Sequence, residues 1–234
     1  MNLLFLDTET TGIKDARLAQ VAYIHAPSGV EFTGMFKPPI PIEDGAAAVT
    51  GITNEMVASC EPWEGSSAFL EVDSLLKGGA VLVAHNAKFD IGVLKRSGLE
   101  VSAYICTMKI ARHLRPMAVN HKLESLFAEL ELELPEGREA KAHDALGDIL
   151  MMRALLRHFV LEHVYQNPSA SVGSTIQYFI DFCNNPLLKT MPFGKHKGRP
   201  MAQLPKDYVM WLREKPEMDD EVIFSLNHYF PVAL

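Results

Sequence analysis

The sequence contains only three cysteines and no long apolar run. These two features exclude disulfide-rich, zinc-finger-like and membrane-spanning proteins. The three cysteines, Cys60, Cys106 and Cys183, lie far apart, so they offer neither a disulfide framework nor the paired spacing of a zinc site. No apolar stretch approaches the roughly 20 residues that a membrane-spanning helix needs. Acids at Asp7 and Glu9 follow the apolar start, without the small-residue cleavage site of a signal peptide. We therefore expect a cytoplasmic protein with reduced thiols and no membrane partner.

The sequence also lacks an excess of positive charge. A net charge of −7 at pH 7 argues against a protein that coats nucleic acid by bulk electrostatics. The charge is uneven, however. Residues 107–122 contain four cations and no acid, and residues 185–215 contain seven cations against two acids, a local charge of +5. Each segment is either a solvated surface or a contact for a nucleic-acid backbone, with Lys109 and Arg112 as candidates in the first.

The pattern of apolar residues predicts three strands followed by strands that alternate with helices. Apolar runs at 2–6, 20–25 and 30–37 indicate an antiparallel meander, with turn residues between the last two runs. Further strands are predicted at 80–84 and 104–106. Helical spacing is present at 46–58, 66–76, a segment ending near 96, 108–114, 122–130 and 144–163. This order is typical of an α/β sheet of mixed direction.

The pattern weakens in one place, and we place a boundary there. Residues 167–174 are small and polar, as in a linker. We predict one domain at 1–165, a linker region at 166–184, and a small basic module at 185–234. The module contains the segment Phe193-Gly194-Lys195-His196-Lys197-Gly198 and a terminal helical pattern.

Two acids stand together at the end of the first predicted strand. Asp7 and Glu9 are two residues apart, and side chains at that spacing project to the same side of a strand. Neighbouring carboxylates repel each other and raise a pKa unless a cation lies between them. A divalent metal would remove this conflict. The alternative is that the two acids are merely a polar, solvated strand end.

Asp90 is a third candidate, because it follows the predicted strand at 80–84. Sites in open α/β sheets form at such strand ends. An aspartate in this place can also serve only as the N-cap of the helix that follows. The capping role would explain Asp90 alone, but not why acids terminate two separate strands.

Asp148 and His143 lie at the start of the last predicted helix of the first domain. Helical spacing places Asp148 on or beside the apolar face, where an unpaired charge costs on the order of several kcal/mol. It therefore requires a cation, either a metal or a buried arginine. A lone histidine such as His143 is usually structural or solvated. Its ordinary pKa of about 6.5 would also let it take a proton from water near neutral pH.

Three segments of the chain resemble the three motifs of the DEDDh 3′–5′ exonucleases. They are Asp7-Thr8-Glu9-Thr10-Thr11-Gly12, His85-Asn86-Ala87-Lys88-Phe89-Asp90 and His143-Asp144-Ala145-Leu146-Gly147-Asp148. They occur in the family's order with family-like spacing, and the likeness covers residues 1–165. Residues 105–112 and 193–198 resemble a narrower branch of the same family.

The resemblance implies a ribonuclease H-like fold, with a mixed five-stranded sheet flanked by helices, and two Mg²⁺ ions, with Mn²⁺ as an alternative. It implies that the catalytic metal ligands are Asp7, Glu9, Asp90 and Asp148, and that His143 is the general base. It also implies that the substrate is contacted by Thr8, Thr10, His85, Asn86, Phe89 and His143. The chain departs from the family at Thr50, where many members have histidine, so a substrate contact made by that histidine in relatives would be weakened or altered here.

The implied activity is hydrolysis of phosphodiester bonds at DNA 3′ ends, single-stranded and also duplex, with release of nucleoside monophosphates. The alternatives are a proofreading subunit of a DNA polymerase, an exonuclease that trims RNA 3′ ends, and an inactive nucleic-acid-binding module of the same fold. The intact acids and His143 argue against the last. No residue indicates recognition of a 2′-hydroxyl, so DNA over RNA rests on the resemblance. A homo-oligomer stays open.

Overall fold

The structure, a computed structural model, describes residues 1–26, 28–134, 145–185, 187–216 and 218–231. The chain divides into two compact units, Met1–Asp181 and Phe182–Leu234. Helix α8 (Val172–Asn184) occupies most of the segment 166–184, which the sequence predicts as a linker region. None of the described helices is both long enough and apolar enough to cross a membrane.

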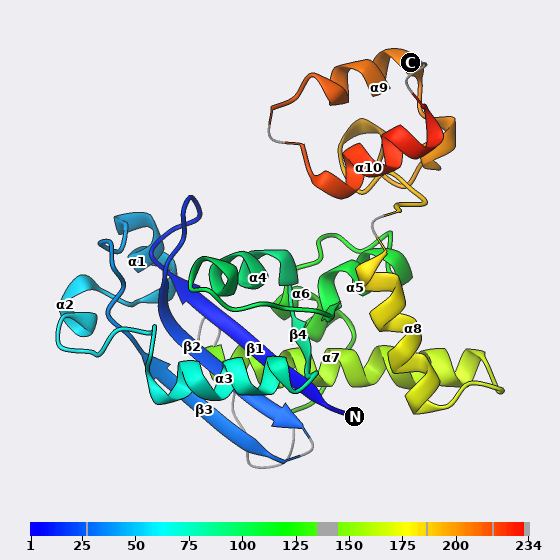
Figure 1. Ribbon diagram of the computed structural model, residues 1–234. Coiled ribbons are helices and arrows are strands. Elements are labelled where there is room, and N and C mark those ends of the chain that lie inside the picture. Colours follow the sequence, from blue (N-terminus) through cyan, green and yellow to red (C-terminus); the bar gives the residue numbers. More distant parts are fainter. Residues whose placement is uncertain (27, 135–144, 186, 217, 232–234) are drawn as a thin grey trace. The chain divides into compact units, whose positions relative to one another are not determined.

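A five-stranded mixed sheet forms the centre of the first unit (Figure 1). Its strand order is β3-β2-β1-β4-β5. The first three strands are antiparallel neighbours, whereas β4 and β5 run parallel to β1. The strands are β1 (Leu3–Thr10), β2 (Leu18–Ala26), β3 (Val30–Met35), β4 (Val81–Ala84) and β5 (Tyr104–Cys106). The predicted α/β class and the mixed five-stranded sheet are confirmed.

Helices flank this sheet and connect its parallel strands. In the first unit, besides α8, they are α1 (Asp44–Thr50), α2 (Asn54–Val57), α3 (Ser67–Lys77), α4 (Ala87–Arg96), α5 (Thr107–Leu114), α6 (Leu123–Glu129) and α7 (Ala145–Gln166). The single helix predicted at 46–58 is wrong. Two short helices replace it, because Gly51 adopts a left-handed φ of 72° that ends α1.

The central strand β1 is covered on both faces, which fits its continuous apolar start. Because side chains alternate along a strand, its residues divide between the two faces. Leu4 and Leu6 belong to a buried cluster with residues of α3 and α4. Phe5 faces the opposite side, where the guanidinium of Arg153 in α7 lies 5.6 Å from its ring centroid. The strand is therefore held between α3 and α4 on one face and α7 on the other.

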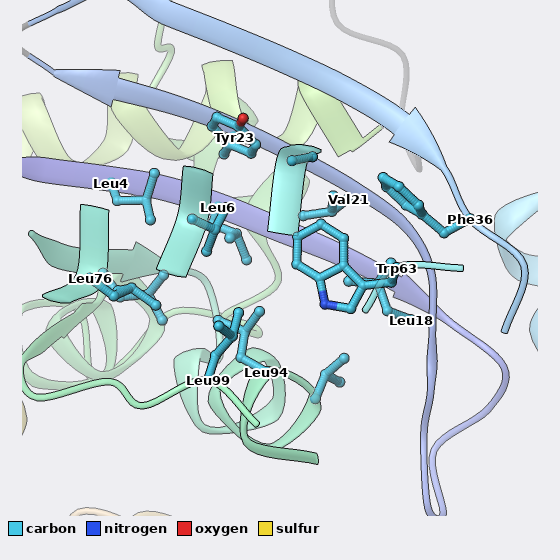
Figure 2. Packing of buried hydrophobic residues seen from close by; sticks show 14 of the residues in the cluster. Leu4, Leu6, Leu18, Val21, Tyr23, Phe36, Trp63, Leu76, Leu94 and Leu99 are labelled. Atoms are coloured by element: carbon cyan, nitrogen blue, oxygen red, sulfur yellow. The ribbon is translucent and has the colours of Figure 1, made fainter. Parts of the chain in front are cut away.

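Aromatic side chains fill the part of the core between the meander and α3. Trp63 is 1% exposed and meets Phe36 edge to face, with ring centroids 5.1 Å apart. Figure 2 shows Trp63 beside Val21 and Phe36, with Leu4 and Leu6 of β1 in the same cluster. Burying one such aliphatic side chain stabilises the fold by about 1.5–3 kcal/mol. This packing fixes the strand that carries the first acidic motif.

The second unit has a small core of its own. Its elements are the 3₁₀ turns η1 (Gly194–His196) and η2 (Met201–Gln203) and the helices α9 (Lys206–Arg213) and α10 (Asp220–Tyr229). Eight buried side chains of this unit pack together, namely Met191, Met201, Leu204, Tyr208, Val209, Leu212, Val222 and Leu226.

Candidate metal centre and active site

Two acids of β1 project toward α7. Asp7 and Glu9 share the parity of Phe5, so they lie on the face that α7 covers. The sequence predicts that the strand ends near Asp7, but β1 continues to Thr10 because its backbone still pairs with β2 there. Both carboxylates are thus carried by regular strand backbone, which fixes their direction.

Asp148 in the first turn of α7 completes a group of three carboxylates. One oxygen each of Asp7, Glu9 and Asp148 can be chosen so that all lie within 4.8 Å of one another. Among the described residues, this is the one group of three or more potential ligand side chains with that spacing. Helix α7 packs against β1, and its buried residues include Ile149, next to Asp148, and Met152, about one turn further on. The helix therefore presents this acid to the strand.

Asp90 approaches β1 from the side of α4. It is 3% exposed, and its Oδ1 accepts two hydrogen bonds from Thr8. The backbone N–H of Thr8 donates at 3.1 Å, and the hydroxyl donates at 2.7 Å. The N-cap position of α4 is Asn86, whose side chain makes no capping hydrogen bond, whereas Asp90 lies inside the first turn of α4. The second motif is therefore attached to the first through this carboxylate.

The electrostatics show that these acids compete for protons. Burial, then the charges of Asp90, Glu9 and Asp148, raise the pKa of Asp7 well above its ordinary value, although part of Asp7 remains accessible. Burial raises the pKa of Asp90 to about 7, against the opposing effect of the hydrogen bonds from Thr8. Such a cluster is stabilised by either protons or a cation. An all-oxygen donor set fits hard divalent ions such as Mg²⁺ or Mn²⁺.

The hydroxyls of the two predicted substrate-binding threonines are both engaged within the protein. Thr8 donates to Asp90, as described above, and the hydroxyl of Thr10 donates to the carbonyl of Gly12 at 2.8 Å. Both side chains are buried. Their hydroxyls shape the backbone around the acids, so a substrate contact would fall to other atoms of this segment.

His85 follows β4, and both of its ring nitrogens are engaged. Its Nε2 donates to the carbonyl of His121 at 2.8 Å, so its Nδ1 accepts from the hydroxyl of Thr107 at 2.9 Å. Burial above all lowers the pKa of His85 to about 4. This ring is a neutral connector between β4, the start of α5 and the segment before α6.

The remaining predicted substrate residues fall into three different situations. Asn86 is exposed and has a left-handed φ of 66° at the N-cap of α4. Phe89 is half-buried and packs on the main core cluster. His143 lies outside the described residues. The partners of His85, Thr107 and His121, were not singled out from the sequence, since they are 22 and 36 residues away from it.

The acids described above lie in a segment of the chain that matches a known protein family. A family described as "Exonuclease" matches residues 4–156, which include the first two motifs and Asp148. The chain belongs to this exonuclease family. The second unit matches a different family, described as "Putative quorum-sensing-regulated virulence factor", over residues 183–217.

Individual relatives of this exonuclease agree with the family. The chain is 30% identical to "Exodeoxyribonuclease 10" of Escherichia coli strain K12, over 97% of this chain and 98% of the relative. It is 32% identical to "DNA polymerase III subunit epsilon-like protein" of Rhodobacter capsulatus, over 67% of this chain but 23% of the relative.

A solved structure described as "Exonuclease X in complex with 5' overhanging duplex DNA" is also similar. Its TM-score is 0.59 at 27% identity, and the match covers 77% of this chain and 98% of the other. Exonuclease X is the narrower branch that residues 105–112 resemble. The assignment of residues 193–198 to that branch stays a prediction.

Proposed function

We propose that this exonuclease removes nucleotides from DNA 3′ ends, in the 3′–5′ direction, and releases nucleoside monophosphates. The observation that carries the proposal is the convergence of carboxylate oxygens of Asp7, Glu9 and Asp148 within 4.8 Å. Three acids at this spacing, with a fourth buried beside them, need a positive partner at neutral pH. The relatives' names, an exodeoxyribonuclease and an exonuclease in complex with DNA, support DNA as the substrate.

Asp7, Glu9, Asp90 and Asp148 would hold two Mg²⁺ ions, with Mn²⁺ as an alternative. When bound, such ions supply the charge that stabilises the attacking and leaving oxygens of phosphodiester hydrolysis. The chain's own contribution is to fix the acids. Thr8 holds the Asp90 carboxylate from the strand side, and α7 holds Asp148 against β1.

The role of general base falls to His143 in this proposal. Its ordinary pKa suits the removal of a proton from an attacking water. His85, the other histidine of the three motifs, is a poor candidate, because both of its nitrogens are engaged and its pKa is lowered to about 4.

The experiment that tests the proposal uses strands labelled at the 5′ end. Single-stranded DNA, duplex DNA and RNA of one sequence are incubated with the full-length protein and Mg²⁺, and again with a chelator. The proposal predicts a ladder of shortened DNA in Mg²⁺ and no shortening in the chelator, with mononucleotides as the product. A strand whose 3′-hydroxyl is blocked should be cut more slowly.

Two of the alternatives have their own signatures in the same assay. Preferential shortening of RNA would favour an RNA-trimming exonuclease, and no cleavage at all would favour a binding module. Internal cleavage, or cleavage that starts at the 5′ end, would contradict the proposal.

A further inference from the structure

The second unit carries an exposed aromatic side chain surrounded by cations. Trp211 on α9 is 48% exposed, whereas Trp63, the other tryptophan of the chain, is 1% exposed. The ammonium of Lys215 lies 4.5 Å from the centroid of the Trp211 ring. We use the name "Trp211 surface" for the set Lys195, His196, Arg199, Trp211 and Lys215.

The buried side chain of Tyr208 contacts three members of this surface. The Trp211 ring stacks on it, with centroids 5.4 Å apart and planes 21° apart. The His196 ring meets it edge to face at 4.5 Å, and the Lys195 ammonium lies 5.4 Å from its centroid. Turn η1 and helix α9 are therefore joined through one tyrosine, and their side chains form one surface.

Gly194 allows the turn to lie this close to the helix. Its φ is 69°, and an added Cβ would lie 3.0 Å from the hydroxyl oxygen of Tyr208. A larger residue would be strained at this φ, and its Cβ would press on the Tyr208 hydroxyl. The glycine of the segment Phe193–Gly198 thus has a definite structural task, which is to bring Lys195 and His196 onto the Trp211 surface.

Three of the five side chains of this surface, Lys195, Arg199 and Lys215, are cations at neutral pH. The guanidinium of Arg199 lies 3.5 Å from Nδ1 of His196. Slight burial and the cations Arg199 and Lys195 lower the pKa of His196, despite the opposing charge of Asp207. No acid occurs between residues 182 and 206, and the six acids of residues 182–234 are Asp207 and five at 214–221, of which Glu214 adjoins Lys215.

We propose that the Trp211 surface binds an unpaired nucleic-acid strand. One base would stack on Trp211 in place of the Lys215 ammonium that lies over the ring, and Lys195, Arg199 and Lys215 would contact the neighbouring phosphates. An exposed aromatic face flanked by cations is the chemistry that single strands require, because every base offers a flat face and every phosphate a negative charge. Binding of an apolar protein partner would not require these three cations.

This inference goes beyond the catalytic proposal, since none of these residues belongs to the carboxylate site. Two binding sites on one chain raise the effective concentration of a strand at the second site once the first is occupied. The Trp211 surface would therefore raise the affinity of the chain for a strand without taking part in hydrolysis of the strand.

Tryptophan fluorescence gives a direct test with the full-length protein. The protein is titrated with oligo(dT) in a chelator, so that no strand is degraded, and binding is followed in parallel by anisotropy of a labelled strand. Because Trp63 is buried and Trp211 is exposed, stacking should quench the Trp211 emission. A blunt duplex, whose base faces are covered, should quench far less.

Matched variants separate stacking from charge. Trp211→Ala should weaken oligo(dT) binding about tenfold, whereas an abasic strand should bind wild type and variant equally. Met210→Ala, at the adjacent and even more exposed position, is the control and should bind as wild type does. Lys215→Glu should reduce the salt slope of binding by about 1. Lys77→Glu in α3 makes the same charge change in the other unit and should not.

Three results would overturn the inference. They are unchanged Trp211 emission when the strand is bound, wild-type affinity of Trp211→Ala, and absence of any oligo(dT) binding. Equal quenching by blunt duplex would contradict a preference for unpaired bases. The catalytic proposal fails on a different readout, the absence of nucleotide release in Mg²⁺, so the two failures are distinguishable.

Discussion

At the residue scale, the carboxylate of Asp90 depends on Thr8 for its ionised form. The hydroxyl of Thr8 donates at 2.7 Å, and this bond lowers the pKa that burial raises. Thr8→Val removes the donor but keeps the shape of the side chain. We expect nucleotide release by this variant to need a higher Mg²⁺ concentration, by about tenfold, because a hydrogen bond to a charged group contributes about 1.5–3 kcal/mol.

Thr8→Ser is the matched control, because it keeps the hydroxyl. Mg²⁺ titrations of nucleotide release compare the three proteins. If Thr8→Val and the wild type need the same Mg²⁺ concentration, Thr8 does not act through Asp90.

The raised pKa of Asp90 predicts a specific pH dependence for the metal-free protein. The folded-state pKa is about 7 and the ordinary value is 3.8, so the folded state binds a proton more tightly than the unfolded state does. Stability from this proton is complete below the ordinary pKa and is lost as the pH rises through the folded-state pKa. Asp90→Asn does not titrate and keeps an acceptor for Thr8.

The variant should therefore become increasingly more stable than the wild type as the pH rises between these two values. Urea unfolding in a chelator at a series of pH values measures the difference. His85 titrates in the opposite sense, but it is present in both proteins and cancels. A difference in the free energy of unfolding that does not change with pH would contradict the assigned pKa.

Single residues also show how far sequence reasoning reaches. Strand alternation alone predicts that Asp7 and Glu9 share a side, and helical spacing alone predicts that Asp148 needs a cation. The bonds of His85 to Thr107 and His121 could not be predicted, because those partners are brought together by the packing of β4, α5 and the segment before α6. No local pattern encodes such a contact.

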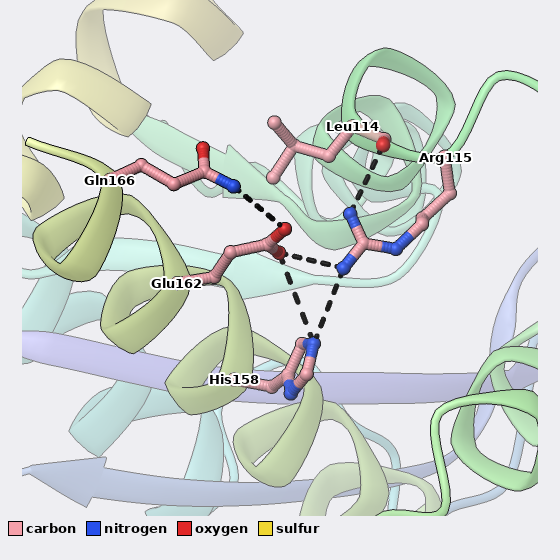
Figure 3. Close-up of polar contacts among 5 residues, drawn as sticks. All are labelled: Leu114, Arg115, His158, Glu162 and Gln166. Carbon is pink, nitrogen blue, oxygen red and sulfur yellow. Dashed lines mark hydrogen bonds and ion pairs between the residues drawn. The ribbon is translucent and has the colours of Figure 1, made fainter.

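At the scale of elements, α7 is tied to the segment after α5 by one ion pair. Arg115 donates to a carboxylate oxygen of Glu162 at 2.7 Å, and its guanidinium also bonds the carbonyl of Leu114 (Figure 3). Gln166 donates to the other oxygen of Glu162 at 3.2 Å. The backbone carbonyl of Arg115 accepts from His121, so this ion pair continues into the contacts of His85.

This ion pair predicts a stability difference between two substitutions. Lys77 and Asp73 form a pair of similar length, 2.6 Å, but the Lys77 side chain is 75% exposed, against 25% for Arg115. Arg115→Met should lower the free energy of unfolding by about 1–2 kcal/mol, and Lys77→Met by at most about 0.5 kcal/mol. Chemical denaturation measures both. Equal losses would mean that burial does not strengthen the Arg115 pair.

Element boundaries were predicted less well than element types. The apolar pattern predicts the first strand at residues 2–6 only. Backbone pairing can continue past the last apolar side chain, and an apolar pattern contains no information about that pairing. The structure carries β1 to Thr10, which moves both acids into regular strand. The helix predicted at 46–58 fails for a related reason, since Gly51 ends it through backbone conformation rather than polarity.

At the scale of the whole molecule, the order of strands and helices predicts the α/β class, and the resemblance of the three acidic motifs to the DEDDh exonucleases predicts the family. The end of the first unit was not predictable to the residue, because residues 172–184 look polar and small at their start yet form helix α8. The second unit offers no catalytic pattern, so its role depends on side-chain geometry such as the stacking on Tyr208.

The two units should be separable in function. A chain that ends at Asn184 keeps β1, α4 and α7, and should still release nucleotides from a short single strand in Mg²⁺. It should bind a long oligo(dT) more weakly than the full chain, because the Trp211 surface is missing. Nucleotide release and strand affinity are measured on both proteins, with circular dichroism as the check of folding. A folded truncation without activity would place part of the active site in the second unit.

The proposed function rests on Asp7, Glu9 and Asp148 acting together as the metal-binding core of the exonuclease. The most direct test is shortening of a 5′-labelled strand as Mg²⁺ is varied, with the wild type, Asp148→Asn, and Asp73→Asn as a control outside the carboxylate site. A metal-binding role of Asp148 predicts that Asp148→Asn stays folded but releases no nucleotides at any Mg²⁺ concentration, while Asp73→Asn behaves as the wild type. Release by Asp148→Asn at the wild-type rate, with the same Mg²⁺ dependence, would contradict it.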